Sequence, residues 1–194
     1  MHQEIKITAD MYWVGGNDRR KALFESVYPI PRGVSYNSYL VLDEKTVLLD
    51  TVDKEVSDVF FDGVEHLLSG RQLDYVIVNH MEPDHAATLG ELVVRHPEVR
   101  IVCNAKTADM IKQFFAFDID SRAHLVKEGD TLCTGKKHVQ FAGIPTFAPE
   151  HFARVTQVDT MKRKQFVKGM EQIAQEGAIQ IFRDLGAGME EVIV

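Results

Sequence analysis

Cysteine is scarce in this 194-residue chain, which contains only Cys103 and Cys133. Two isolated cysteines make neither a disulfide framework nor a Cys-x-x-Cys redox pair, so we expect a protein of the reducing cytoplasm. No apolar run approaches the roughly 18 residues of a membrane span, and the N-terminus has no basic-then-apolar leader. The sequence also lacks a G-x-x-x-x-G-K-[ST] loop, which argues against nucleotide triphosphate binding.

Lysine and arginine are also fewer than aspartate and glutamate, 22 against 29. The net charge is -7 with an isoelectric point near 5.6, which disfavours a nucleic-acid or anionic membrane surface. The chain is 45% hydrophobic and 26% charged, as in ordinary globular proteins. Its length suits one domain, or a domain plus a fragment.

Up to about Lys137, strand-like and helix-like segments alternate, which predicts an α/β fold. Residues 17–33 are polar and interrupted by proline, so we expect a loop there. A helix is expected to end before Pro97, and residues 34–53 are expected to form two strands joined at Asp43 and Glu44. The expected strands lie in 4–16, 34–53, 75–78, 99–104 and 125–132, and the expected helices are 56–68, 86–95 and 105–115.

The pattern changes after Lys137. Residues 143–159 suggest a loop and one strand. Residues 160–177 predict a helix with Thr160 as N-cap and Gly177 just past its C-terminus. Two short strands, 178–184 and 189–194, are expected to follow, giving a β-α-β-β order.

Four metal-ligating side chains crowd into the segment "HMEPDH": His80, Glu82, Asp84 and His85. The segment directly follows the strand expected at 75–78, and ligand sites in α/β folds favour the carboxyl ends of strands. Imidazole and carboxylate together suit iron, manganese or zinc, and the two carboxylates favour iron or manganese. The alternative is a polar surface turn in which Asp84 or His85 caps the following helix.

The segment "HMEPDH" resembles the H-x-E-x-D-H motif of flavodiiron proteins, and residues 13–53 and 124–141 resemble that family too. The resemblance covers about residues 1–137. It implies a metallo-β-lactamase fold and two irons that reduce oxygen or nitric oxide with electrons from FMN. It also implies that His80 and Glu82 ligate one iron, and Asp84 and His85 the other.

The resemblance stops before the family's remaining ligands. A histidine is expected near Thr146 to Ala148, where the sequence reads "PTFAPE". His151 lies a few residues further on in surroundings that do not match. It is a weak candidate ligand, and an ordinary surface or core histidine is the preferred interpretation. Asp159 is a candidate bridging ligand by residue type only. The flavodoxin-like domain that carries FMN has no counterpart.

Residues 138–194 resemble instead the segment that follows the β-barrel of bacterial peptide-chain release factor three, where a ferredoxin-like domain begins. The chain thus resembles a join between two families near residues 136–141. The basic stretch "MKRKQFVK" could touch RNA, but a solvated helix face is the preferred interpretation.

These resemblances imply two parts, residues 1–137 as the N-terminal part of a metallo-β-lactamase-like αββα domain and residues 138–194 as a truncated ferredoxin-like segment. The expected function is the metal-binding part of an oxygen or nitric oxide reductase. The alternatives are a metal-dependent hydrolase of the same fold and a non-enzymatic ribosome-associated fragment. We expect a homo-oligomer with a flavin or rubredoxin-type electron donor, without membrane or nucleic-acid partners. An incomplete sandwich should leave apolar faces exposed, which predicts marginal stability or self-association.

Overall fold

The computed structural model describes residues 4–24, 26–142, 153–175, 179–181 and 191–193. The chain divides into two compact units, Met1–Phe141 and Ala142–Val194, and each is considered by itself. Among the described residues, no helix combines the length and the apolar character needed to cross a lipid bilayer.

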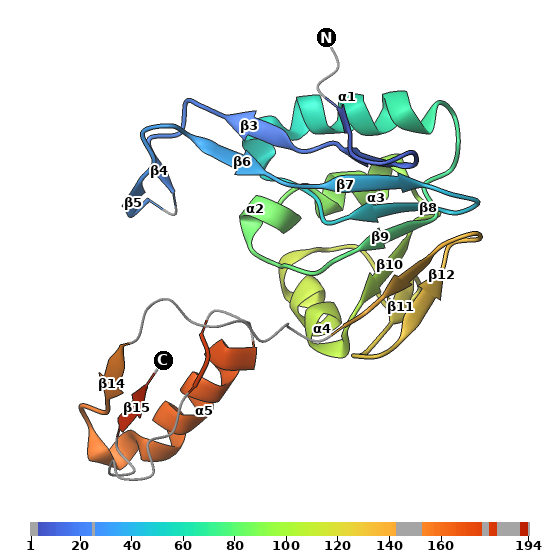
Figure 1. The fold of residues 1–194 in the computed structure, drawn as a ribbon. Helices are drawn as coiled ribbons and strands as arrows, with labels where there is room; N and C mark the ends of the chain where they lie inside the picture. The colour runs from blue at the N-terminus through green and yellow to red at the C-terminus, as the bar shows by residue number, and fades with distance from the viewer. Residues whose placement is uncertain (1–3, 25, 143–152, 176–178, 182–190, 194) are drawn as a thin grey trace. The chain divides into compact units, whose positions relative to one another are not determined.

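A mixed seven-stranded sheet forms the centre of the first unit (Figure 1). Its first four strands pair antiparallel, and β8, β9, β10 and β11 run parallel to one another. The carboxyl ends of these parallel strands therefore lie at one edge of the sheet. In sheet order the strands are β1 (Ile5–Lys6), β2 (Met11–Trp13), β7 (Tyr39–Leu42), β8 (Thr46–Leu49), β9 (Tyr75–Ile77), β10 (Arg100–Cys103) and β11 (Ala123–Leu125).

The two faces of this sheet bury alternate residues of the same strands. In β8, Leu48 packs into the larger core with helices α1 (Ser57–Leu68), α3 (Leu89–Arg95) and α4 (Ala105–Phe114). Its neighbour Val47 packs on the other face with Leu132 of the hairpin formed by β12 (Thr131–Cys133) and β13 (His138–Gln140). Burial at both faces explains why these strands are runs of apolar residues. The predicted α/β fold is confirmed.

Residues 17–33 were predicted to be a loop, and that prediction is wrong. β3 (Gly16–Asp18) pairs with β6 (Val34–Tyr36), and β4 (Leu23–Phe24) pairs with β5 (Tyr28–Pro29) in a hairpin that projects away from the sheet (Figure 1). These strands are two or three residues long, so they show no period that a sequence reading could detect. The prediction of two strands in 34–53 also missed β6 as a separate strand.

The helix predicted from Ala86 to Arg95 is two helices, α2 (Pro83–Ala86) and α3. They are separated at Thr88. The Thr88 hydroxyl donates to the carbonyl oxygen of Val52 at 2.9 Å and accepts from the backbone amide of Val52 at 3.2 Å. These bonds hold the break between the helices against the segment after β8. The other two predicted helices are confirmed, and α1 is preceded by the 3-10 turn Lys54–Val56.

In the second unit, β14 (Arg154–Thr156) pairs antiparallel with β15 (Glu191–Ile193), and helix α5 (Arg163–Gln175) lies between them in the chain. The 3-10 turn Thr160–Lys162 precedes α5, and its N-cap is Asp159 rather than the predicted Thr160. The Asp159 carboxylate accepts the amide hydrogen of Met161 at 3.0 Å. Gly177 lies outside the described residues. Residues 179–181 carry no strand, contrary to the prediction for that stretch.

Candidate metal centre

The loop after β9 and the first turn of α2 carry the four predicted ligands at the carboxyl edge of the parallel strands. His80 lies in the loop, Glu82 is the N-cap residue of α2, and Asp84 and His85 lie within α2. Pro83 occupies the first turn of that helix, where its fixed φ suits the position. The Glu82 side chain makes no capping hydrogen bond, so capping does not account for its carboxylate.

Ligand atoms of His80, Glu82 and Asp84 all lie within 4.8 Å of one another. The Nε2 atom of His80 is 3.5 Å from Oε2 of Glu82 and 3.7 Å from Oδ1 of Asp84. The other oxygen of Asp84, Oδ2, is 3.7 Å from Nε2 of His85. Asp84 thus lies between the two imidazoles, whose ring centres are 5.4 Å apart.

These separations fit a metal ion. Ligands bound at about 2.1 Å lie roughly 3 to 4 Å from one another, and Nε2 of His80 lies at such distances from Glu82 and Asp84. His85 is not part of the group that converges within 4.8 Å, although its Nε2 lies 3.7 Å from Oδ2 of Asp84. Oδ1 of Asp84 and Nδ1 of His85 are buried and have no hydrogen-bond partner among the described residues. Buried polar atoms in this state, beside a second carboxylate, are stabilised by a cation. The donor set of two imidazoles and two carboxylates suits iron, manganese or zinc.

Asp50 supports the loop and was missed by the sequence analysis. Its Oδ1 accepts the backbone amide hydrogens of Asn79 at 2.7 Å and His80 at 3.3 Å, and its Oδ2 accepts from the Asn79 side chain at 3.2 Å. Burial raises the pKa of the Asp50 carboxyl above its ordinary value, although the Asn79 hydrogen bonds oppose that shift. Asp50 also has a positive φ of 55°, which aspartate tolerates better than most residues.

Thr51 supports helix α2, which carries Asp84 and His85. Its amide and its hydroxyl both donate to the carbonyl oxygen of His85, at 2.9 and 2.8 Å. Together with the bonds between Thr88 and Val52, they tie α2 to the segment that follows β8. The only sequence signal for this support was the polar pair Asp50-Thr51 directly after an apolar strand.

The two weaker candidate ligands lie elsewhere in the chain. His151 is outside the described residues. Asp159 belongs to the second unit, where its carboxylate caps the turn before α5 and lies 3.8 Å from Nζ of Lys162. The structure gives Asp159 a local structural role as an N-cap.

A stretch of the sequence that includes most of the first unit and the start of the second matches a known family. The family model described as "ODP family beta lactamase" matches residues 34–158, which is more than half of the chain. The chain belongs to the ODP beta-lactamase family. The four candidate metal ligands and the supporting Asp50 of this ODP-family chain lie inside the matched region.

Among its relatives, the ODP-family chain is 38% identical over 143 residues to the anaerobic nitric oxide reductase flavorubredoxin of Klebsiella pneumoniae, covering 73% of this chain and 30% of the relative. It is 32% identical over 146 residues to the nitric oxide reductase of Moorella thermoacetica, covering 75% of this chain and 36% of the relative. These identities confirm the resemblance to flavodiiron proteins. The chain spans about a third of the length of these relatives.

Solved structures agree with this family assignment of the ODP-family chain. The rubredoxin:oxygen oxidoreductase of Desulfovibrio gigas superposes with a TM-score of 0.67 at 32% identity, covering 73% of this chain and 35% of that one. The fold of the first unit is thus metallo-β-lactamase-like. Residues 141–194 match a different family model, "Class II release factor RF3, C-terminal domain". The resemblance of the tail to a release factor is therefore also confirmed.

Proposed function

We propose that His80, Glu82, Asp84 and His85 bind iron and that the chain is the metal-binding part of an oxygen or nitric oxide reductase. The observation that carries this proposal is the convergence of His80, Glu82 and Asp84 within 4.8 Å, beside buried atoms of Asp84 and His85 that lack hydrogen-bond partners. The names of the relatives, a nitric oxide reductase and a rubredoxin:oxygen oxidoreductase, supply the reaction.

Each side chain would contribute in its own way. His80 and Glu82 come from the loop and are 46% and 60% exposed, so they would bind on the solvent side. Asp84 and His85 are 20% and 25% exposed and would bind on the protein side. Bound iron would supply the one-electron redox chemistry. Asp50 and Thr51 would hold the loop and α2 in place while substrate binds and leaves.

Electrons would come from a separate flavin or rubredoxin-type donor, as the names flavorubredoxin and rubredoxin:oxygen oxidoreductase suggest. We assign no FMN-binding segment to the described residues. The working form is proposed to be a homo-oligomer. Sedimentation analysis of the iron-loaded chain would test this, and a monomer at all concentrations would contradict it.

The first experiment is to measure iron, manganese and zinc per chain after anaerobic reconstitution. His80→Ala and His85→Ala should each lower the iron content, while His138→Ala should leave it unchanged because His138 is an exposed residue of β13. Nitric oxide and oxygen consumption with a reduced flavin donor should then follow the iron content.

Two outcomes would contradict the proposal. Iron content near zero, or equal in all three variants, would mean that the cluster does not bind iron. A preference for zinc together with esterase activity that His80→Ala abolishes would favour a hydrolase of the same fold.

We also propose that residues 138–194 form a separate release-factor-like segment. The boundary between the compact units at Phe141 and the family match over 141–194 support it. Limited proteolysis should cut between residues 136 and 153 first. Cleavage that begins within β7 to β10 would argue against two independent parts. Co-sedimentation with ribosomes that requires residues 138–194 would give the tail a function of its own.

A further inference from the structure

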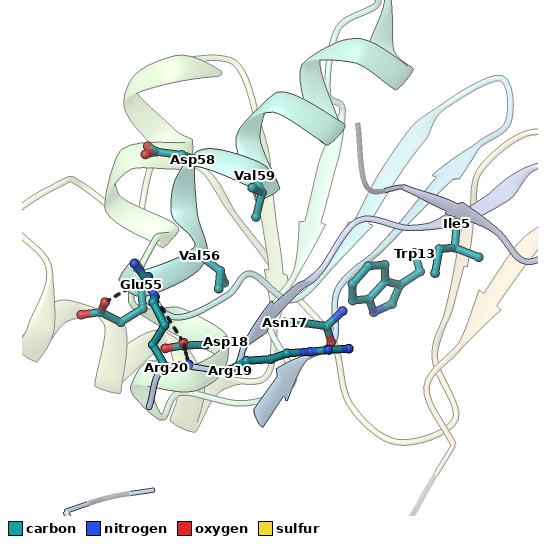
Figure 2. A pocket seen from close by; sticks show the side chains of 10 residues that line it. All are labelled: Ile5, Trp13, Asn17, Asp18, Arg19, Arg20, Glu55, Val56, Asp58 and Val59. Carbon is teal, nitrogen blue, oxygen red and sulfur yellow. Dashed lines mark hydrogen bonds and ion pairs between the residues drawn. The ribbon is translucent and has the colours of Figure 1, made fainter. Parts of the chain in front are cut away.

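A pocket of about 720 Å³ lies in the first unit, and none of its lining residues belongs to the candidate metal centre (Figure 2). One wall is β3 with the two arginines that follow it, and the opposite wall is the start of α1 with the turn before it. Trp13 and Ile5, from β2 and β1, close one end. A volume of this size is typical of pockets for small ligands.

Gly15 and Gly16 allow these walls to come together. A Cβ atom on Gly15 would lie 2.9 Å from the Trp13 ring, and one on Gly16 would lie 2.5 Å from Cβ of Val56. Gly16 therefore lets β3 pack directly on the turn before α1, and Gly15 lets the chain just before β3 approach Trp13 and the carbonyl oxygen of Tyr36, which a Cβ on Gly15 would overlap.

The charges in the pocket are unevenly matched. Arg20 pairs with Asp18 at 3.7 Å and with Glu55 at 4.0 Å, so these three side chains together carry a net negative charge, and Asp58 adds a further carboxylate to the lining. Arg19 has no hydrogen bond or ion pair with any residue in the described part of the chain. Figure 2 shows its side chain directed along the pocket toward Asn17 and Trp13, away from Asp58. Arg19 thus carries a positive charge without a direct ion-pair partner in the described part of the chain, at the end of the pocket near Trp13.

Asn17 adds a second donor beside Arg19. The oxygen of its side-chain amide accepts from the Ser35 hydroxyl, which leaves its NH₂ group without a partner among the described residues. The indole NH of Trp13 is already bonded to Asn37 at 2.9 Å, so Trp13 offers its ring rather than a donor. The end of the pocket therefore presents a guanidinium and an amide NH₂ beside apolar surface that comes mostly from Ile5, which is 56% exposed, and only in small part from Trp13, which is 8% exposed.

We propose that this pocket binds a small carboxylic acid with an apolar body. The carboxylate would pair with Arg19, whose planar guanidinium matches two carboxylate oxygens, and would accept a hydrogen bond from Asn17. The apolar body would lie on Ile5 and on the small exposed part of Trp13. This site is independent of the proposed iron chemistry.

The test uses the full chain, with cyclohexanecarboxylate as the probe and cyclohexylmethanol and cyclohexylmethylamine as neutral and cationic controls. None of the three absorbs where tryptophan does, and Trp13 is the one tryptophan of the chain, so its emission reports on the pocket directly. Calorimetric titration at constant ionic strength gives a second readout. The titrations are run on chelator-treated protein and repeated with His80→Ala, so that binding at the metal centre is recognised.

The acid should bind saturably, and the two controls should bind about tenfold more weakly or worse. Arg19→Gln should weaken the acid by about tenfold or more, since one charge-assisted contact is removed. Arg32→Gln removes an exposed arginine outside the pocket and should have no effect. His80→Ala should bind like the wild type.

Three results would overturn the proposal. The first is no saturable signal by either readout. The second is equal binding of the acid and the alcohol, or a preference for the amine. The third is an affinity that Arg19→Gln leaves unchanged or that His80→Ala abolishes.

Discussion

Replacing Asp50 by alanine tests whether the metal loop is held by its support or by its ligands. The substitution removes the acceptor for the backbone amides of Asn79 and His80. Each hydrogen bond is worth about 1 kcal/mol net, and those to a charged group somewhat more. Alanine at a φ of 55° adds about 1 kcal/mol. The total loss in the free energy of unfolding is about 3 kcal/mol.

The assays are urea unfolding, thermal unfolding and a titration that measures iron affinity. A loss of about 3 kcal/mol corresponds to a fall in Tm of roughly 6 to 12 °C for a chain of this size. Iron affinity should fall about 10- to 100-fold, as for other residues that orient metal ligands. Asp50→Asn is the matched control, because asparagine tolerates a positive φ and keeps an acceptor oxygen, so it should lose only about 1 kcal/mol. If Asp50→Ala loses less than 1 kcal/mol and binds iron normally, the support described here is wrong.

The remaining predictions concern the structure around the site. Burial alone would raise the pKa of Asp53, but hydrogen bonds from the Glu55 amide and from Lys21 leave it below its ordinary value. That carboxylate therefore stabilises the fold above about pH 4 and loses this effect as pH falls further, and Lys21→Met should flatten the acid limb of a stability-versus-pH curve. Gly16→Ala should destabilise the first unit by about 1 to 3 kcal/mol in thermal unfolding, because its Cβ meets Val56. Thr88→Val should cost about 2 kcal/mol in urea unfolding through its two lost bonds, and no change would contradict their role.

The parts of the fold with strong periodicity were predictable from the sequence. Helices α1 and α4 have apolar residues at helical spacing, and β9 and β10 are short apolar runs, so their positions follow from composition and period. The ladder of β3 with β6 was not predictable, because its partners are separated by a polar, proline-containing stretch. The two strands are also linked near their ends by a contact that the sequence does not reveal, the bond from Lys21 to the Tyr36 hydroxyl.

Only part of the candidate site, likewise, could be predicted from the sequence. The four ligands could be named because imidazoles and carboxylates are dense in "HMEPDH", and density is visible in a sequence. Asp50 and Thr51 could not, because Asp50 contacts the loop and Thr51 contacts α2 from about 30 residues away, and neither stands out in the sequence. The N-cap before α5 shows a smaller version of this limit. Asp159 and Thr160 are both good N-caps by type, and only the structure selects Asp159.

The bonds from Asp50, Thr51 and Thr88 have a consequence for how such a site can evolve. The bonds from Asp50 and Thr51 act on the backbone of the loop and of α2, and those from Thr88 act on the backbone of Val52. None of them uses the imidazole or carboxylate of a proposed ligand. The four proposed ligand side chains could therefore be exchanged one at a time while the bonds that position the loop and α2 remain in place. A lineage could change its metal, or lose it altogether, and still inherit the same loop.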